Sequence, residues 1–474
     1  MKIICQVVYL VLEWLKSHSM QITADLHLHS KYSRAVSRDM VLPIMAQMAS
    51  KKGLDLLTTG DFTHPLWLRE AKENLVEDAD GIFKLKNQKS NLKNIVRFLL
   101  SVEVSSIYSQ DKKVRRVHSL LFAPSIEVAE KINKELFKRG ANLTSDGRPI
   151  VGLTPKNLLE IILSVDKKCF LIPCHVWTPW FSLYGSMSGF DSIEECFGDL
   201  ASEIFAVETG LSSDPSMNWR IKELENRSIV SFSDAHSPMK MGREATVFVP
   251  KNGMSNVKSQ MSNVSYDDIR LALKQDPKNR LKIGYTIEFY PEEGKYHYTG
   301  HRNCNVSQSP EETKKNGTVC PVCKKPLTVG VMHRVEDLAN TSENFESKPN
   351  AMGLNWIIDP SKNHPPFVKL VPLNEIIAEV LECPVGSPKV FRVFEDLVSK
   401  FESEMNVLLK TDISEIEKVA GAEIAEAVNK VRIGDLFIRP GYDGEYGIVK
   451  ISKKEAADVA KNIDEPQNQL GLDI

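Results

Sequence analysis

Two closely spaced pairs of metal-binding side chains lie some 200 residues apart in this sequence. His27 and His29 follow an apolar run near the amino terminus, and Asp234 and His236 follow another such run. Residues two apart on a strand point to the same face, so each pair can ligate one ion. Imidazole and carboxylate groups collected at one end of a barrel form multinuclear metal sites. A site of this kind hydrolyses phosphate esters.

Further candidate ligands end other apolar runs between the two pairs. Glu103, His118 and His175 each follow or end a short apolar segment. A single histidine in a strand is usually a core or surface residue, but two pairs and three single residues are not explained in that way. A carboxylate such as Glu103 can bridge two ions. Asp61 and His64 follow the run 54–57, and either can serve as the proton shuttle, so we assign catalysis to Glu103, Asp61 and His64.

The composition limits the class of protein. The chain has 474 residues, a net charge of −2 and a pI of about 6.6, so any surface for nucleic acid has to be local. Its eight cysteines do not form a disulfide framework, which indicates an intracellular protein. No apolar segment is long enough to cross a membrane. We expect Met20 to be the natural start and residues 1–19 to be an extension with little structural role.

Residues 20–290 alternate strand-like and helix-like segments, which predicts an α/β fold with a parallel sheet closed into a barrel. Helices are expected at 40–51, 126–139, 154–165 and 215–226. Two strand runs flank residues 109–112 without a helix, so the sequence predicts a hairpin there and an irregular barrel. Asp39 is either a metal ligand or a helix cap, and the helix that follows it favours the cap.

Residues 291–345 contain few large apolar side chains and need another source of stability. His301 and Cys304 are followed by Cys320 and Cys323, which is a typical spacing for a tetrahedral structural zinc site. His297 and His333 are alternatives to His301. Residues 346–369 are interpreted as a linker.

From residue 370 onward the sequence is helical, with a short β tail, and we place a domain at 370–474. Gly386 and Gly421 lie between consecutive helices there, as in helix-hairpin-helix modules whose backbone amides hold DNA phosphates. Helical hairpins that merely pack together have the same pattern.

An aromatic loop follows His175 directly, where a barrel enzyme places its substrate-contacting loops. Exposed rings in this loop can stack on a DNA base, whereas a loop packed by its own aromatic rings has the same sequence. The loop supplies the following candidates for DNA or base contact: Trp177, Trp180, Phe181, Tyr184, Gly185 and Ser186.

These motifs carry two family resemblances. The segment DLHLHS, with the later glutamate, histidine and SDAH elements, resembles the polymerase-and-histidinol-phosphatase (PHP) superfamily. That resemblance implies a distorted seven-stranded (β/α)7 barrel and a metal centre built by eight residues: His27, His29, Asp61, Glu103, His118, His175, Asp234 and His236. The second motif departs from the superfamily pattern because Phe62 follows Asp61 where a histidine is usual, and His64 is the candidate replacement.

The three parts in this order resemble the endonuclease Q family of DNA-repair nucleases over residues 20 to about 455, through GDFTHP, CHVWTPWFS, SFSDAHSP and RPGYDGEYG. The resemblance implies two or three divalent ions (Zn²⁺, Mn²⁺ or Mg²⁺) in the barrel, a structural Zn²⁺, and single- or double-stranded DNA with a damaged base as partner. It implies cleavage on the 5′ side of uracil, hypoxanthine, xanthine or an abasic site, in a nucleoid-associated protein.

Two other functions compete with this interpretation. A small-molecule phosphatase of the PHP superfamily explains the barrel but gives the zinc-binding segment and the helical tail no role. A non-catalytic DNA-binding scaffold is disfavoured by the near-complete ligand set. The sequence leaves open which metals bind, which lesion is preferred and whether a sliding clamp is a partner.

Overall fold

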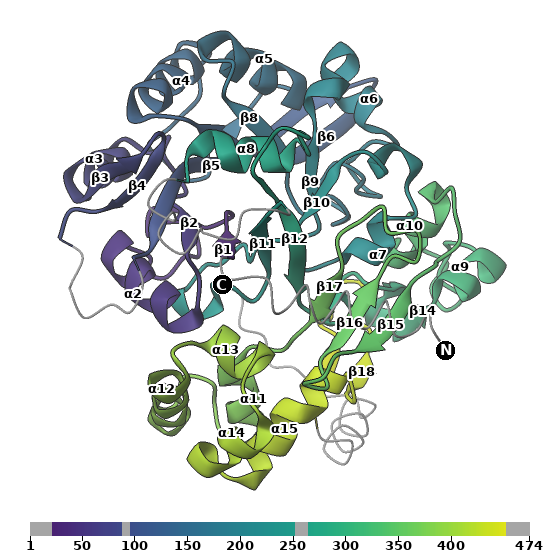
Figure 1. Cartoon of the computed structure of the whole chain (residues 1–474). Coiled ribbons are helices and arrows are strands. Elements are labelled where there is room, and N and C mark those ends of the chain that lie inside the picture. Colours follow the sequence, from purple (N-terminus) through teal and green to yellow (C-terminus); the bar gives the residue numbers. More distant parts are fainter. Residues whose placement is uncertain (1–20, 88–94, 252–263, 452–474) are drawn as a thin grey trace.

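The computed structural model describes residues 21–87, 95–251 and 264–451 (Figure 1). The expected amino-terminal extension at 1–19 and the last part of the expected helical domain, 452–474, lie outside these ranges. No helix among the described residues is long and apolar enough to cross a membrane.

A ring of seven strands forms the centre of the molecule. The first five pair in succession: β1 (Ile22–Asp25), β2 (Leu56–Thr58), β5 (Arg97–Gln110), β6 (Lys113–Ala123) and β8 (Phe170–Pro173). The parallel pair β9 (Ala206–Glu208) and β10 (Ser228–Val230) is a separate two-stranded sheet that continues the ring beyond β8, where the amide of Val176 donates to the carbonyl of Glu208 at 3.0 Å. A bridge between Leu28 and Ala235 joins the chain after β1 to the chain after β10. Strand β6 runs antiparallel to both neighbours, so the barrel is distorted, and the expected α/β barrel class is confirmed.

The β5–β6 hairpin turns at Asp111 and Lys112, both in the left-handed region, as a two-residue hairpin turn requires. The hairpin expected at 109–112 is therefore present. A short strand, β7 (Ile150–Val151), pairs with β5 beside it.

Helices cover the outside of the barrel, as the strand–helix alternation predicts. They are α2 (Leu42–Lys52), α3 (Pro65–Asn74), α4 (Ile126–Lys138), α5 (Pro155–Val165), α6 (Ile193–Phe197), α7 (Pro215–Asn218) and α8 (Tyr266–Leu273). Ser125 and Thr154 cap α4 and α5 with their side chains.

Two expectations about these helices are wrong. Helix α2 starts after Val41 without a side-chain cap, and Asp39 is exposed, so Asp39 is not its cap. The helix expected at 215–226 is reduced to α7 and a 3-10 turn at Lys222–Leu224. The backbone leaves the helical conformation at Ile221, whose φ of −100° and ψ of 110° are extended, so the two helical pieces are separate.

The main sheet extends beyond the barrel on both sides. Strands β3 (Leu75–Ala79) and β4 (Ile82–Leu85) add to β5, while β11 (Ala245–Pro250) and β12 (Leu281–Glu288) add to β1. Residues 346–369 are not a linker, because they form β15 (Glu346–Pro349), β16 (Asn355–Ile358) and β17 (Phe367–Lys369), and β17 pairs with β12. Trp356 packs against Tyr285 of β12 and supplies the apolar contact that holds this extension.

The segment 291–345 forms a small module beside the barrel. It contains β13 (Thr299–His301), β14 (Val306–Gln308), α9 (Pro310–Asn316) and α10 (Val331–Leu338). The carboxyl-terminal hairpin of β18 (Phe437–Arg439) and β19 (Ile448–Lys450) docks onto it, since the amide of Tyr298 donates to the carbonyl of Gly441 at 2.9 Å. The β tail thus belongs in space with this module and not with the helices that precede it.

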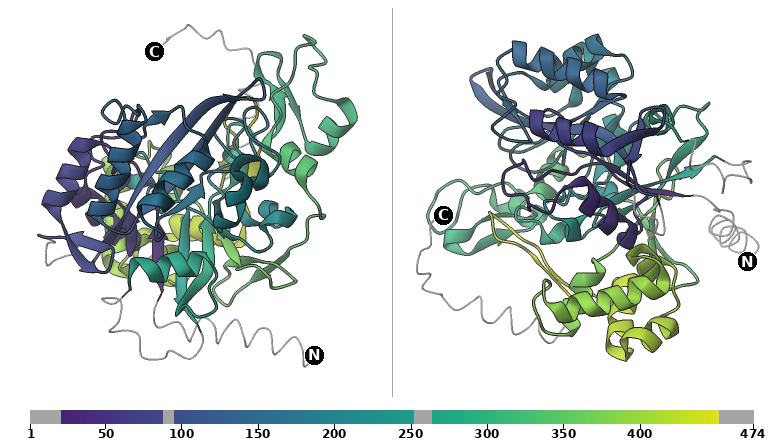
Figure 2. Two further views of the ribbon diagram at one scale, coloured as in Figure 1. Left: turned by 90° about the horizontal axis from the view of Figure 1, so that it is seen from above. Right: turned by 90° about the vertical axis from the view of Figure 1, so that its left-hand side faces the viewer.

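Five carboxyl-terminal helices gather on one side of the barrel (Figures 1 and 2). They are α11 (Leu373–Val380), α12 (Pro388–Phe401), α13 (Glu404–Leu409), α14 (Ile413–Ala420) and α15 (Ala422–Ile433). A buried ion pair fastens them to α2: the Lys52 ammonium lies 2.6 Å from a Glu404 oxygen, and the other oxygen accepts the amide of Leu373 at 2.8 Å. Helix α2 thus connects the barrel to the helical domain.

We expect Lys52→Met to lower the free energy of unfolding by about 3–5 kcal/mol, because it leaves the Glu404 carboxylate buried and unpaired. Lys51→Ala is the matched control, since its ion pair with Glu395 is partly exposed and contributes about 0–1 kcal/mol. Denaturant melts of the two variants measure the difference. Equal stabilities would show that the Lys52–Glu404 pair does not hold the domains together.

Candidate metal centre

The ends of the barrel strands bring the expected ligands together. His27 and His29 follow β1, Asp234 and His236 follow β10, and Glu103 lies within β5. Glu103 is at the centre of the cluster and is only 1% exposed. One of its oxygens lies 2.5 Å from His118 and 3.3 Å from His175. Its other oxygen lies 3.3 Å from His29.

Four overlapping groups of ligand atoms result, each with its atoms within 4.8 Å of one another, and three of them consist of expected ligands alone, while the fourth is His27 with Cys174 and Glu208. The first is His27, His29 and Glu103, the second is Glu103, His118 and His175, and the third is His29, Asp234 and His236. The Asp234 carboxylate also approaches His27 at 3.6 Å and His29 at 3.1 Å. Glu103 therefore has one oxygen toward each of the first two groups, which is the arrangement of a carboxylate that bridges two ions.

Charges and unpaired atoms in the cluster fit bound cations. The Nε2 atom of His27 is buried and has no hydrogen-bond partner within the described ranges. Burial alone lowers the pKa of His27, but Glu208 and Asp234 outweigh it and raise that pKa well above its usual value. Burial likewise disfavours ionised Glu103, but His118 and Arg148 hold the pKa of its carboxyl well below its usual range. The carboxylates thus demand positive charge at this position, which divalent ions can supply.

The site contains two further residues, which the sequence motifs did not reveal. Glu208 ends β9, and its carboxylate accepts from His27 Nδ1 at 2.8 Å and from the His175 amide at 2.8 Å. Arg148 lies just before β7, and its guanidinium donates to Glu103 at 3.1 Å. Glu208 follows the apolar run 204–207, the same signal that marks Glu103, whereas nothing in the sequence around Arg148 distinguishes it.

Asp61 lies behind the ligands and is a positioning residue. One oxygen of its carboxylate accepts from the Ser30 amide at 2.6 Å and the Ser33 hydroxyl at 2.9 Å, and the other lies 3.3 Å from His29 Nδ1. Its oxygens are thus engaged in holding His29, so the prediction that Asp61 is a metal ligand is not supported by this geometry. Carboxylates that orient a ligating imidazole in this way are common in metal sites.

His64 does not replace the histidine missing from the second motif. Its ring stacks on Tyr32, with centroids 4.3 Å apart, and it belongs to none of the ligand groups found among the described residues. Asp39 is exposed and is likewise outside these groups. The assignment of His64 to catalysis therefore has no support from its position.

The four residues that the sequence predicts to bind zinc converge in the small module. His301, Cys304, Cys320 and Cys323 place one ligand atom each within 4.8 Å of the others, which fits a tetrahedral zinc site. The alternative ligands are elsewhere: the ring of His297 stacks on Tyr298, and His333 Nε2 lies 3.7 Å from Asp337 on α10. The module has only a few buried apolar side chains of its own, so it fits the expectation of a segment that depends on a metal.

The aromatic loop is mostly part of the barrel wall. The Trp177 and Tyr184 rings are fully buried and stacked 4.8 Å apart, and the Trp177 indole donates to Asn218 at 2.8 Å. The prediction that these two rings bind a base is therefore wrong. Ser186 donates to the carbonyl of Val329, and a Cβ on Gly185 would lie 2.5 Å from the carbonyl of Thr178. Ser186 thus fastens the loop to the module at 291–345, whereas Gly185 allows the loop to pack closely on itself.

Trp180 and Phe181 remain at the surface of the site. Both are partly exposed, and the Trp180 ring meets Tyr296 of the module edge-on at 5.4 Å. Phe181 has a φ of 64°, and its ring lies 4.9 Å from that of His118. A strained backbone that holds an aromatic ring against a metal-binding histidine is typical of a functional position.

Comparisons with known proteins agree with this architecture. The crystal structure of the lesion-specific endonuclease PfuEndoQ from Pyrococcus furiosus superposes with a TM-score of 0.74 at 31% identity, over 95% of this chain and 100% of that one. This chain belongs to the endonuclease Q family. A structure of endonuclease Q with a 27-mer duplex carrying an abasic lesion gives the same TM-score at 32% identity, over 92% of this chain and 98% of the other.

An uncharacterized protein of Bacillus subtilis, YqxK, is 26% identical over 444 residues, which is 91% of this chain and 99% of that protein, whereas two further matches cover only parts of proteins. The family described as the MJ0043 C-terminal domain matches residues 372–435 of this endonuclease Q family member. An uncharacterized protein, MJ0043 of Methanocaldococcus jannaschii, is 33% identical over 280 residues, which is 59% of this chain and 31% of that protein. The chain thus aligns with less than a third of that relative's length.

The helical domain of this endonuclease Q family member leaves both hairpin glycines accessible. Gly386 lies between α11 and α12 and Gly421 between α14 and α15, and a Cβ at either position would meet no atom within 4 Å. Gly421 has a φ of 90°, which favours glycine. The two hairpins therefore present open backbone at their tips.

Glu208→Gln should weaken metal binding in the barrel about 10- to 100-fold, because it removes the charge that fixes His27 and the His175 amide. Titration of the metal-depleted protein with Mn²⁺ measures this, with the exposed Glu194→Gln as control. An unchanged affinity would exclude Glu208 from a positioning role.

Cys320→Ser should lower the melting temperature and remove about one zinc ion per chain, since the small module loses a ligand of its tetrahedral site. Cys383→Ser is the control, because Cys383 is half-buried and lies outside the ligand group. Zinc analysis and thermal melts report the result. A melting curve and zinc content like those of the unaltered protein would contradict a structural zinc site.

Proposed function

We propose that this protein is a metal-dependent DNA-repair endonuclease that cleaves the phosphodiester on the 5′ side of a damaged base. The observation that carries the proposal is the group of ligands around Glu103, which has one carboxylate oxygen toward each of two histidine-containing groups. The endonuclease Q relative that was solved with an abasic-lesion duplex supports DNA as the partner. We extend the substrates to uracil, hypoxanthine and xanthine as well as abasic sites.

Residues of the chain have distinct roles in the proposed reaction. Seven residues would hold the ions: His27, His29, Glu103, His118, His175, Asp234 and His236. Divalent ions at such a site lower the pKa of water and neutralise the charge of a phosphodiester. Asp61 and Glu208 keep His29 and His27 in a fixed ring orientation through their Nδ1 atoms. Arg148 adds a positive charge next to Glu103, where the phosphate would lie.

Contacts to DNA outside the metal centre complete the proposal. Phe181 and Trp180 are placed to touch the nucleotide next to the cleaved bond, because Phe181 packs on His118. The open hairpins at Gly386 and Gly421 suit backbone contacts to phosphates, which hold DNA without reading its sequence. We place the protein inside the cell, where its DNA is.

The competing functions have less support. A small-molecule phosphatase needs neither the zinc-binding module nor the helical domain, and both pack onto the barrel through specific contacts such as Lys52–Glu404. A scaffold without catalysis needs no buried cluster of ligands. The comparisons name duplex DNA as the partner of one relative and name no clamp.

His29→Ala and Asp234→Ala should each reduce cleavage at least about 100-fold, because each removes a candidate metal ligand. His29 belongs to two of the ligand groups, and Asp234 belongs to one of them and lies 3.1 Å from His29. His333→Ala, outside the ligand groups, should cleave normally. The assay uses labelled duplexes that carry uracil, hypoxanthine, an abasic site or no lesion, with and without Mn²⁺ or Mg²⁺. Cleavage by the two ligand variants at the rate of the unaltered protein would contradict the assignment of the catalytic site. Cleavage of the lesion-free duplex at the same rate as the lesion duplexes would contradict lesion specificity.

A further inference from the structure

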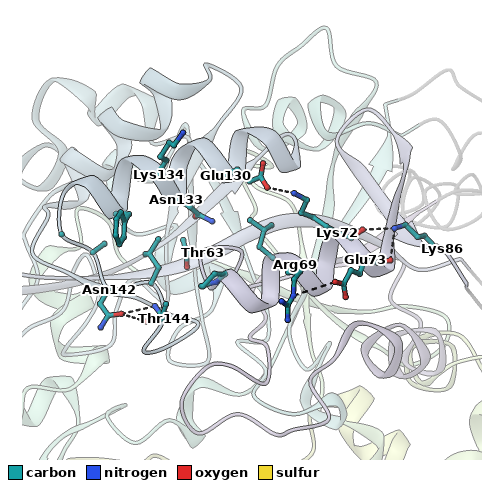
Figure 3. A pocket seen from close by; sticks show the side chains of 16 residues that line it. Thr63, Arg69, Lys72, Glu73, Lys86, Glu130, Asn133, Lys134, Asn142 and Thr144 are labelled. Carbon is teal, nitrogen blue, oxygen red and sulfur yellow. Dashed lines mark hydrogen bonds and ion pairs between the residues drawn. The ribbon is translucent and has the colours of Figure 1, made fainter.

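A long groove runs along the flank of the barrel between helices α3 and α4 (Figure 3). Its volume is about 1320 Å³. Pockets for small ligands and cofactors usually have about 300–1,000 Å³. The groove therefore suits a segment of a polymer better than a small molecule.

The groove has an apolar floor and an unusually exposed aromatic ring. Leu68, Leu143 and Ala141 line it, and Phe137 at its edge is 71% exposed. A phenyl ring in this position does not stabilise the core. It is available to stack on a ligand.

Positive charge predominates around the groove. Arg69, Lys72, Lys86 and Lys134 line it, against only two carboxylates, Glu73 and Glu130. The Lys72–Glu130 ion pair spans the two helices at 2.6 Å, as Figure 3 shows. Lys134 is exposed and makes no ion pair within the part of the chain that the structure describes. An anionic ligand is therefore favoured.

The groove reaches the loop that follows β2, close to Asp61. Thr63 and Thr144 line this part of the groove, and Thr63 follows Asp61 by two residues. The Thr63 hydroxyl donates to the carbonyl of Gly147 at 3.4 Å, next to Arg148, which reaches Glu103. The groove is thus joined to the ligand cluster through buried residues, because Asp61 holds His29 and Gly147 precedes Arg148.

We propose that the groove between α3 and α4 binds a single-stranded DNA segment that continues from the metal centre. This proposal rests on the proposed nuclease function, since it assigns the groove to a strand released when the duplex opens at the lesion. An exposed ring beside cations is the combination that single-stranded DNA uses, through base stacking and phosphate contacts. The bases of a duplex are stacked on one another, so they cannot stack on the exposed ring. An apolar peptide lacks the negative charges that would pair with the surplus of cations.

Binding of a fluorescein-labelled, lesion-free thymidine 12-mer to the full-length protein tests the groove without cleavage. Phe137→Ala should weaken this binding about 5-fold or more through lost stacking. Lys134→Glu should weaken it as well and reduce its salt dependence. Two matched controls should bind within about 2-fold of the unaltered protein: Phe345→Ala, an exposed phenylalanine outside the groove, and Lys138→Glu, on the same helix but outside the lining.

Photocrosslinking of the same strand with 5-iododeoxyuridine locates the contact. A crosslinked peptide that contains Phe137, together with the loss of affinity, supports the proposal. Crosslinks only elsewhere, with unchanged affinity of both groove variants, overturn it and leave the groove to an apolar peptide of a partner protein. Cleavage of lesion duplexes is measured separately. If the protein does not cleave them but crosslinks to the strand at Phe137, the proposed nuclease function is refuted, while the proposed DNA-binding role of the groove is retained.

Discussion

The buried carboxylate of Glu103 constrains the whole catalytic half of the molecule. It is almost inaccessible to water, yet its pKa is held well below its usual range by the neighbouring His118 and Arg148. An ionised carboxylate in such a place requires positive charge on every side. Strands from both halves of the barrel therefore have to deliver histidines to one point. Carboxylates behind them hold the histidine rings in place, since Asp61 lies 3.3 Å from His29 and Glu208 lies 2.8 Å from His27.

The strands and most of the ligands were predictable because their signals are local. A short apolar run followed by histidine or carboxylate identifies a strand end, and the cysteine spacing identifies the zinc-binding module. Asp61 has the same local signal, but its carboxylate is held by Ser30 and Ser33, and the sequence does not reveal such partners. Arg148 reaches the site from a loop whose path depends on β7 pairing with β5. Contacts of that kind are set by the fold and leave no periodic pattern.

Burial was the other property that the sequence did not reveal. The sequence of the aromatic loop is compatible both with a binding surface and with packing against the barrel. In the structure, Trp177 and Tyr184 are buried in the barrel wall, while Trp180 and Phe181 are partly exposed at the site. Asn218 makes the burial of Trp177 possible, because a buried indole N–H needs a hydrogen-bond acceptor and the Asn218 side chain supplies one. Residues 346–369 were misinterpreted for a related reason. Their strands are short and polar on the exposed side, and only their pairing with β12 makes them part of the sheet.

The carboxyl-terminal hairpin has a consequence for the order in which the protein matures. The amide of Tyr298 bonds to Gly441, and Arg302 and Thr328 bond to Asp443, so the module at 291–345 receives part of its framework from more than 100 residues downstream. A ribosome releases residue 443 only after the barrel and the helices have emerged. The module at 291–345 is thus completed only late in synthesis, although it lies in the middle of the chain. A truncation that removes Gly441 and Asp443 would take these contacts from the module, and it would also take the bonds of Lys450 and Ile451 to Glu379 from helix α11.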